Sequence, residues 1–182
     1  CSFLRYAVQE SQAEKRFEYH LAVENAADRG SDIVELKPLG NSLFSIIISS
    51  LFKTPVPLQK ISADIASYDS VYVCGPIYMG QLISPLATFI KKNKKTIKSL
   101  HFVTCCGGGE AEKDGKFGYN SVFNKVKEIA GPACLSCEAF PIDLIIPDEL
   151  RGNDEAVMNV RLSSETFSGA IVEKYNQYIQ KM

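Results

Sequence analysis

The sequence predicts an α/β fold in three layers: a doubly wound, five-stranded parallel sheet of strand order 2-1-3-4-5, covered by helices on both faces. Two observations predict it. Short runs rich in β-branched and aromatic residues alternate along the chain with segments whose apolar residues recur at helical spacing. The central run, Val71 to Cys74, carries no charge, as expected of a strand buried on both faces, and it ends at Gly75-Pro76.

Length and charge limit the classes to which this protein can belong. At 182 residues, 46% hydrophobic and 23% charged, the chain is long enough for one full core, and we expect residues 1–182 to form a single domain. Lys and Arg number 20 against 21 Asp and Glu, and a net charge of -1 gives no general field to attract nucleic acid. The basic run Lys91 to Lys95 is interpreted as the solvated end of a helix.

The chain has six cysteines and two histidines. It is too long to depend on a disulfide framework and shows no signal peptide, so we expect a reducing, cytoplasmic location. The longest apolar stretch, Leu43 to Phe52, contains serines and is far too short to cross a bilayer. We therefore expect no membrane span.

Three elements are expected before residue 40. The capping box formed by Ser11 and Glu14 predicts the start of a helix, and Gly30 predicts its end. Lys37-Pro38 ends the extended run that follows. The expected elements are a strand over Phe3–Val8, a helix over Ala13–Asp28 and a strand over Asp32–Leu36.

The segment Asn41–Lys53 has hardly any polar face, which leaves two interpretations open: a short helix buried in the core, or a helix that covers a site or binds a partner. After the central strand, Ser84-Pro85 opens a helix over Leu86–Lys92, because proline suits the first helical position. A strand over Ser99–Thr104 follows, and then the glycine-rich loop Cys105–Gly109.

Three further elements are expected after residue 110. They are a helix over Asn120–Ile129, a strand over Cys137–Ile146 and a closing helix that begins at Ser163. Pro141 marks a bulge or an edge position in the last strand, since proline cannot donate to a ladder. In the order 2-1-3-4-5 the switch point lies between strands one and three, so the loops after Val8, Cys74 and Thr104 should converge on one crevice.

Several segments carry a family resemblance. They are Ile33–Pro38, Tyr68–Gly80, Pro85-Leu86, Phe89-Ile90 and Phe102–Gly108. Over residues 31–110 the chain resembles the flavodoxin family, which includes FMN-binding flavodoxins and flavodoxin-like NAD(P)H reductases. The resemblance implies a flavodoxin-like fold that holds FMN at the carboxyl edge of the sheet.

The resemblance also implies which residues would hold FMN. A flat flavin ring needs close backbone approach, which Gly75 and Gly107 allow, and an apolar plate, which Tyr78 supplies. The implied cofactor-binding set is Gln9, Ser11, Gln12, Gly75, Pro76, Ile77, Tyr78, Met79, Gly80, Thr104, Cys105, Cys106, Gly107 and Gly108. The alternatives are a surface tyrosine in an ordinary turn at Tyr78 and a flexible connection at the glycines.

The expected phosphate loop departs from the family pattern. Residues Gln9–Gln12 contain no glycine and place Glu10 beside the expected anion, which at ~4 Å opposes binding by about 1 to 4 kcal/mol. Two outcomes stay open. Ser11, Gln12 and the helix amides hold the phosphate with help from Lys15 or Arg16, or FMN binds weakly or not at all.

Other chemistry finds little support in the sequence. Cys134 and Cys137 have redox-motif spacing but precede a strand rather than open a helix, and we interpret them as buried or incidental thiols. No second ligand pair suits zinc, so no metal site is expected. No nucleophile elbow is present, and we assign no catalytic residue.

The sequence therefore predicts an FMN-binding redox protein, either an electron carrier with a protein partner or an NAD(P)H-dependent reductase. The alternative is a flavodoxin-fold protein that binds FMN weakly or not at all and acts as an interaction module through Leu43–Phe52. A homo-oligomer is compatible with either of these two functions.

Overall fold

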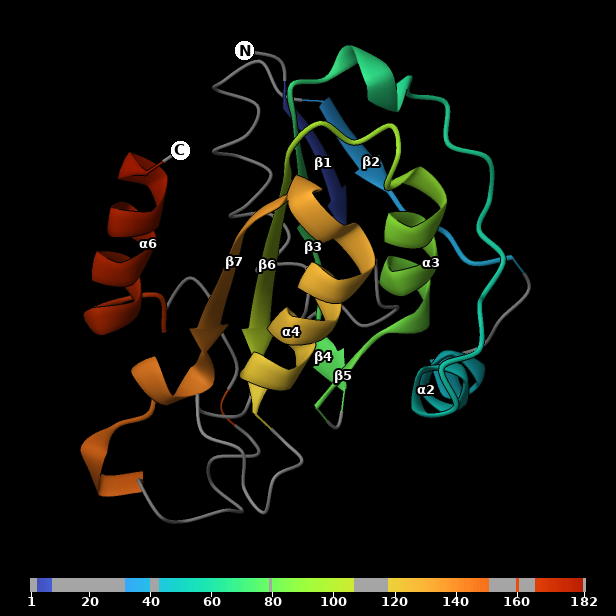
Figure 1. Ribbon diagram of the computed structural model, residues 1–182. Coiled ribbons are helices and arrows are strands. Elements are labelled where there is room, and N and C mark those ends of the chain that lie inside the picture. The colour runs from blue at the N-terminus through green and yellow to red at the C-terminus, as the bar shows by residue number, and fades with distance from the viewer. Residues whose placement is uncertain are drawn as a thin grey trace.

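The computed structural model describes residues 3–7, 32–39, 43–78, 80–106, 118–150, 160 and 166–181. Five strands form a sheet in the order β2-β1-β3-β6-β7, and every neighbouring pair is parallel (Figure 1). The α/β class with a parallel sheet is confirmed. The strands are β1 (Phe3–Ala7), β2 (Asp32–Glu35), β3 (Ser70–Cys74), β6 (Leu100–Cys106) and β7 (Cys134–Pro141).

The described helices lie on both faces of this sheet. They are α2 (Leu43–Leu51), α3 (Ser84–Asn93), α4 (Tyr119–Ala130) and α6 (Ala170–Gln180), with short 3-10 turns at Ile65–Ser67, Gly131–Ala133, Ile142–Leu144 and Asp148–Leu150. In Figure 1, α3 and α4 cover one face and α6 stands beside β7. The helix expected over Ala13–Asp28 lies outside the described residues.

Strand alternation divides the core between the two faces. On the α3 and α4 face, Val71 and Val73 of β3 and Phe102 of β6 are completely buried. They pack against apolar side chains of the two helices, among them Leu86, Phe89, Ile90, Val122 and Val126. On the opposite face, Phe140 of β7 packs against Ile171 of α6. Val71, Tyr72 and Val73 of β3 are all buried, so this uncharged run is covered on both faces of the sheet.

One expected boundary is wrong. The last strand covers Cys134–Pro141 rather than Cys137–Ile146, because a bulge at Leu135 lets it begin earlier and a 3-10 turn at Ile142–Leu144 ends it. The described part of the closing helix begins at Ala170, after Gly169 with a φ of 63°, and its expected start at Ser163 lies outside the described residues. Pro141 ends an edge strand, where a missing N–H costs no ladder bond.

The segment between β3 and α3 forms a small hairpin instead of a plain loop. Its strands β4 (Ile77–Tyr78) and β5 (Gln81–Leu82) pair in antiparallel fashion. Figure 1 shows the hairpin at the carboxyl end of the sheet, beside the lower end of α4. Within the described ranges, no helix has the length and apolar character that crossing a bilayer requires.

Candidate functional site

The carboxyl ends of three strands meet at one edge of the sheet. Ala7, the last residue of β1, is the register partner of Cys74 in β3, which in turn is opposite Val103 in β6. The loops that follow these strands therefore start at neighbouring positions, at the switch point of the strand order. The other parts of the expected site, Gln9, Ser11, Gln12, Met79, Gly107 and Gly108, lie outside the described residues.

Gly75 continues β3 toward this edge. Its N–H donates to the carbonyl of Val103 at 3.2 Å, so this amide is not free to bind a ligand. A Cβ at position 75 would lie 2.7 Å from Cδ1 of Leu86, a completely buried residue of α3. Packing against α3 thus accounts for the glycine, a reason distinct from the predicted close approach to a flavin.

The hairpin that follows is held against the helices. Ile77 packs against the core of the α3 and α4 face, and Tyr78 pairs with Gln81 across a two-residue turn. Gly80 completes that turn with a φ of 67°, a conformation that glycine adopts without strain. Its carbonyl accepts a hydrogen bond from the Ser121 hydroxyl of α4 at 3.2 Å. This contact links the hairpin to α4; the same hydroxyl also lies 3.0 Å from the Gly118 carbonyl oxygen.

The end of β6 lies next to this hairpin, since β4 contacts β6. Thr104 is buried, and its hydroxyl donates to the carbonyl of Cys105 at 3.3 Å. Cys105 and Cys106 are partly exposed thiols, and Cys105 faces the α6 side together with Phe140. The structure thus brings together two of the predicted segments, Gly75–Tyr78 with Gly80, and Thr104–Cys106.

Residues 52–130 match the family model described as a flavodoxin domain. This range, 79 of the 182 residues, resembles a flavodoxin domain. The matched range begins just after α2 and contains β3, the β4–β5 hairpin, α3, β6 and α4. It therefore covers both described segments of the carboxyl edge. No curated protein matches the chain significantly.

Solved structures share the flavodoxin-like fold. A flavoprotein from Lactobacillus acidophilus, in complex with FMN, superimposes with a TM-score of 0.57 at 13% identity, over 76% of this chain and 92% of that chain. Its apo form gives a TM-score of 0.54 at 12% identity, over 76% and 92%. A Bacteroides eggerthii protein, provisionally described as a flavoprotein, gives 0.55 at 16% identity, over 76% and 86%. At these sequence identities, the similarity of this chain to the three structures shows a shared fold alone.

A separate pocket lies on the helix side of the hairpin. Its volume is about 440 Å³, within the range of small-molecule sites. Residues from the end of α2, from β5, from α3 and from α4 line it, and its apolar wall includes Leu82, Val122 and Ile129. Hydroxyl groups hold the wall in place: Ser50 accepts from the Ser84 N–H at 2.9 Å, and Thr88 accepts from the Val56 N–H at 3.1 Å.

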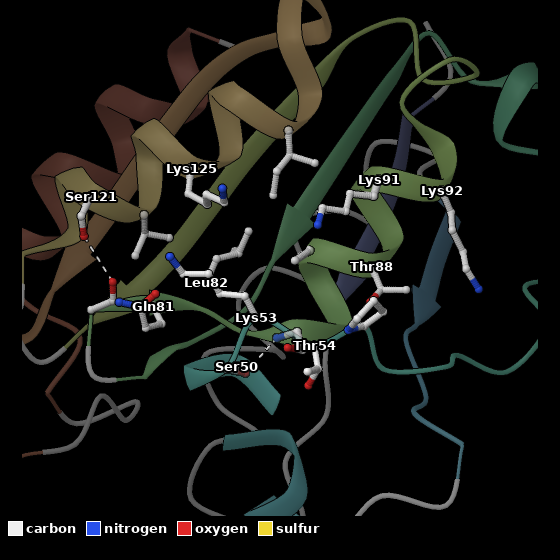
Figure 2. A pocket seen from close by; sticks show the side chains of 16 residues that line it. Ser50, Lys53, Thr54, Gln81, Leu82, Thr88, Lys91, Lys92, Ser121 and Lys125 are labelled. Atoms are coloured by element: carbon white, nitrogen blue, oxygen red, sulfur yellow. Dashed lines mark hydrogen bonds between the residues drawn. The ribbon is translucent and has the colours of Figure 1, made fainter. Parts of the chain in front are cut away.

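Four lysines surround this pocket: Lys53, Lys91, Lys92 and Lys125. Figure 2 shows Lys91 and Lys125 extending from α3 and α4 toward the space between the helices, whereas Lys92 points away from it. Lys125 Nζ lies 2.8 Å from a carboxylate oxygen of Glu128, and no acidic residue of the described ranges forms an ion pair with the other three lysines. An anionic group would therefore find cationic partners here.

Sequence reasoning missed this pocket. It interpreted Lys91–Lys95 as a solvated helix end; Lys91 and Lys92 are exposed in the last turn of α3, and they also line the cavity. The lining comes from four separate elements, so no local run of residues reveals it. The sequence gives only a weak signal for this pocket: besides the basic run, it has Lys53 just after α2 and Lys125 on α4.

Two further findings concern the surroundings of His101 and the search for a metal-binding group among the described residues. His101 of β6 stacks on Tyr72, with ring centroids 4.6 Å apart, and its Nδ1 lies 2.7 Å from the Ser136 hydroxyl of β7. Burial lowers the pKa of His101, since it disfavours the charged imidazole. Among the described residues, no group of three His, Cys, Asp or Glu side chains is placed to hold a metal ion.

Proposed function

We propose that this protein binds FMN at the carboxyl edge of β1, β3 and β6 and acts in redox chemistry. The observation that carries the proposal is the match of residues 52–130 to the flavodoxin domain, because that range supplies both described segments of the edge. The FMN complex of the Lactobacillus acidophilus flavoprotein, a structure of the same fold, supports the choice of cofactor.

Two features of the described residues support a site for a flat ring here. The hairpin after Pro76 is linked to α4, because the Gly80 carbonyl accepts a hydrogen bond from the Ser121 hydroxyl. The end of β6 lies beside it and continues into the predicted Gly107-Gly108. Gly75 N–H is occupied and Pro76 has no N–H, so the amides that bond the ring belong to later residues of the two loops.

In this proposal the chain's own residues position FMN and exclude water. Tyr78 and Met79 form the plate against one side of the ring, and the backbone of Thr104 to Gly108 borders its polar edge. Ser11, Gln12 and the helix amides that follow hold the phosphate. Bound FMN would supply one-electron or two-electron transfer, which the protein tunes through these contacts.

The electron source is either NAD(P)H or a redox protein partner. A reductase leaves an open slot above the ring for a nicotinamide, and a carrier presents a charged face to its partner. Consumption of NADH or NADPH by the FMN-loaded protein, monitored at the nicotinamide absorbance, favours the reductase. A protein that takes single electrons from a chemical donor but leaves both nucleotides unchanged favours the carrier.

A spectroscopic titration tests FMN binding. We expect the purified protein to quench the fluorescence of added FMN in the micromolar range and to shift its visible spectrum. Tyr78→Ser should weaken binding about two- to tenfold, since a stacked ring contributes about 0.5–1.5 kcal/mol. A colourless protein that leaves micromolar FMN fluorescence unchanged would overturn the proposal.

One observation favours the second candidate, an interaction module with little or no FMN. The α2 end exposes large apolar side chains, with Ile48 at 37%, Leu51 at 41% and Phe52 at 74%, directly beside the lysine-lined pocket. In this candidate the protein binds a partner through that surface and shows no quenching of FMN. Light scattering of the chain and of Phe52→Ser then distinguishes self-association, which the variant reduces, from binding of a different partner.

A further inference from the structure

Two thiols lie together at the amino end of β7, opposite the edge proposed for FMN. The Sγ atoms of Cys134 and Cys137 are 3.7 Å apart, and both thiols are free and partly exposed. A disulfide needs about 2.0 Å between sulfurs, so the two atoms are in contact but must approach one another before a bond forms.

A β-bulge is the reason for this contact. In a regular strand, side chains three residues apart point to opposite faces. Here Cys134 is opposite Leu100 while Ser136 is opposite His101, so Leu135 is the extra residue of the bulge. Beyond it, Cys137 is opposite Phe102, and both cysteines pack on the α4 side of the sheet.

The surroundings give the two thiols different roles. A hydrogen bond from Cys137 lowers the pKa of Cys134 to about 7, with help from the Lys127 ammonium and against the effect of burial. The same hydrogen bond raises the pKa of Cys137, and burial adds to the effect. Cys134, the thiol whose pKa is lowered, is therefore the candidate nucleophile of the pair; either sulfur can be the donor in the contact between them, and Cys134 Sγ also lies 3.9 Å from the Ser136 carbonyl oxygen. A thiolate is the form that attacks disulfides.

We propose that Cys134 and Cys137 form a redox-active dithiol that low-molecular-weight disulfides such as oxidised glutathione convert to an intramolecular disulfide. The Cys134 thiolate attacks one glutathione sulfur, forms a mixed disulfide and releases one glutathione thiolate. The Cys137 sulfur, after losing its proton to water, then attacks the Cys134 sulfur and releases the second glutathione. The protein loses two electrons and two protons, and oxidised glutathione is reduced to two thiols.

Mass spectrometry of the full chain tests this proposal. Trypsin leaves both cysteines on one peptide, because no Lys or Arg lies between Lys127 and Arg151. After treatment of the reduced protein with oxidised glutathione, we expect this peptide to lose two hydrogen atoms and to regain them with dithiothreitol. At pH 7, iodoacetamide should label Cys134 at least about tenfold faster than Cys137, since the thiolate fractions differ.

Three variants sharpen the test. Cys137→Ser should stop the reaction at the mixed disulfide on Cys134, and Cys134→Ser should slow glutathionylation of the peptide at least about tenfold. Cys74→Ser, which removes another partly exposed thiol of the chain, should leave oxidation of the pair unchanged. A peptide that stays reduced while Cys74 or Cys105 reacts, or a pair that reacts no faster than these thiols, would overturn the proposal. None of these measurements requires FMN, so a failure of the flavin proposal leaves their outcome unaffected.

Discussion

The two ends of the sheet present different kinds of chemistry. At the carboxyl end the described residues contribute mainly backbone: Gly75 is bonded to Val103, and Gly80 is bonded to Ser121. At the amino end of β7 the side chains carry the chemistry, through two thiols 3.7 Å apart and a histidine bonded to Ser136. The arrangement at the carboxyl end depends on the strand order of the whole sheet, whereas the contact between the two thiols at the amino end depends on one inserted residue, Leu135.

Both ends depend on the strand β6, and Phe102 in its middle provides the largest expected effect. This side chain is completely buried and meets Phe123 edge to face, with ring centroids 6.2 Å apart. Phe102→Ala should lower the free energy of unfolding by about 3–5 kcal/mol, because it leaves a large cavity. Urea denaturation measures this change.

Leu135→Ala is the matched control for this prediction. Leu135 lies in the neighbouring strand but is 62% exposed, so its truncation should change stability by no more than about 0.5 kcal/mol. If Phe102→Ala and Leu135→Ala lowered the free energy of unfolding equally, the burial of Phe102 in β6 would not explain its contribution to stability.

Local sequence patterns predicted the class of fold but not its irregular parts. Uncharged β-branched runs such as Val71–Cys74 are typical of parallel strands, and they do form the centre of the sheet. The hairpin Ile77–Leu82 was expected as a loop, because two strands of two residues each show no period. The bulge at Leu135 leaves no signal in the sequence, so the last strand was expected too late in the chain.

Gly75 offers the second prediction, which separates packing from ligand approach. A methyl group added at this position would lie 2.7 Å from Leu86 Cδ1, so Gly75→Ala should cost about 1–3 kcal/mol through overpacking. Combining it with Leu86→Ala should cost less than the sum of the two single changes, since the methyl group then fills part of the cavity. Thermal or urea unfolding of the four proteins measures this coupling.

A different result would assign Gly75 to the ligand alone. If Gly75→Ala weakened FMN binding while the unfolding free energy stayed within about 0.5 kcal/mol of the parent, packing against α3 would not be the reason for the glycine. Additive losses in the double variant would contradict the packing explanation as well, because residues in contact should couple.

A turn in the candidate site is predictable where the segment is contiguous in sequence. The glycines and proline of Gly75–Gly80 indicate the turn that the hairpin forms, and its relation to FMN, which comes from the resemblance, stays a prediction. The lysine-lined pocket is built from four elements, and only the folded chain brings Lys53 and Lys125 to the same pocket. The contact between Cys134 and Cys137 depends on strand register, which a sequence pattern does not determine.

Glu10 offers the third prediction, for the phosphate end of the FMN site. From the sequence we expect its carboxylate near the phosphate, and a repulsion of about 1 kcal/mol in water at ~4 Å corresponds to roughly fivefold in affinity. Glu10→Gln should therefore tighten FMN binding about fivefold and leave riboflavin, which lacks the phosphate, unchanged. Fluorescence quenching measures both affinities, with the exposed Glu173→Gln as the matched control. An equal gain for both ligands would contradict the electrostatic explanation.

The smallest expected effect concerns pH and the amino end of the sheet. Burial lowers the pKa of His101 in the folded state below the ordinary value near 6.5, so the unfolded chain binds more protons between these two values. Stability should therefore rise with pH across this window and fall as pH decreases from about 6.5 toward the folded pKa.

The variant His101→Phe tests this expectation, because it keeps the stacking on Tyr72 and removes the titrating group. The difference in unfolding free energy between parent and variant should change with pH in that window and level off above about 7.5. A constant difference from pH 5 to pH 8 would mean that the imidazole titrates alike in both states. Ser136 directly follows the bulge residue Leu135, and its hydroxyl lies 2.7 Å from His101 Nδ1. Protonation of His101 therefore affects a contact in the strand segment that carries Cys134 and Cys137.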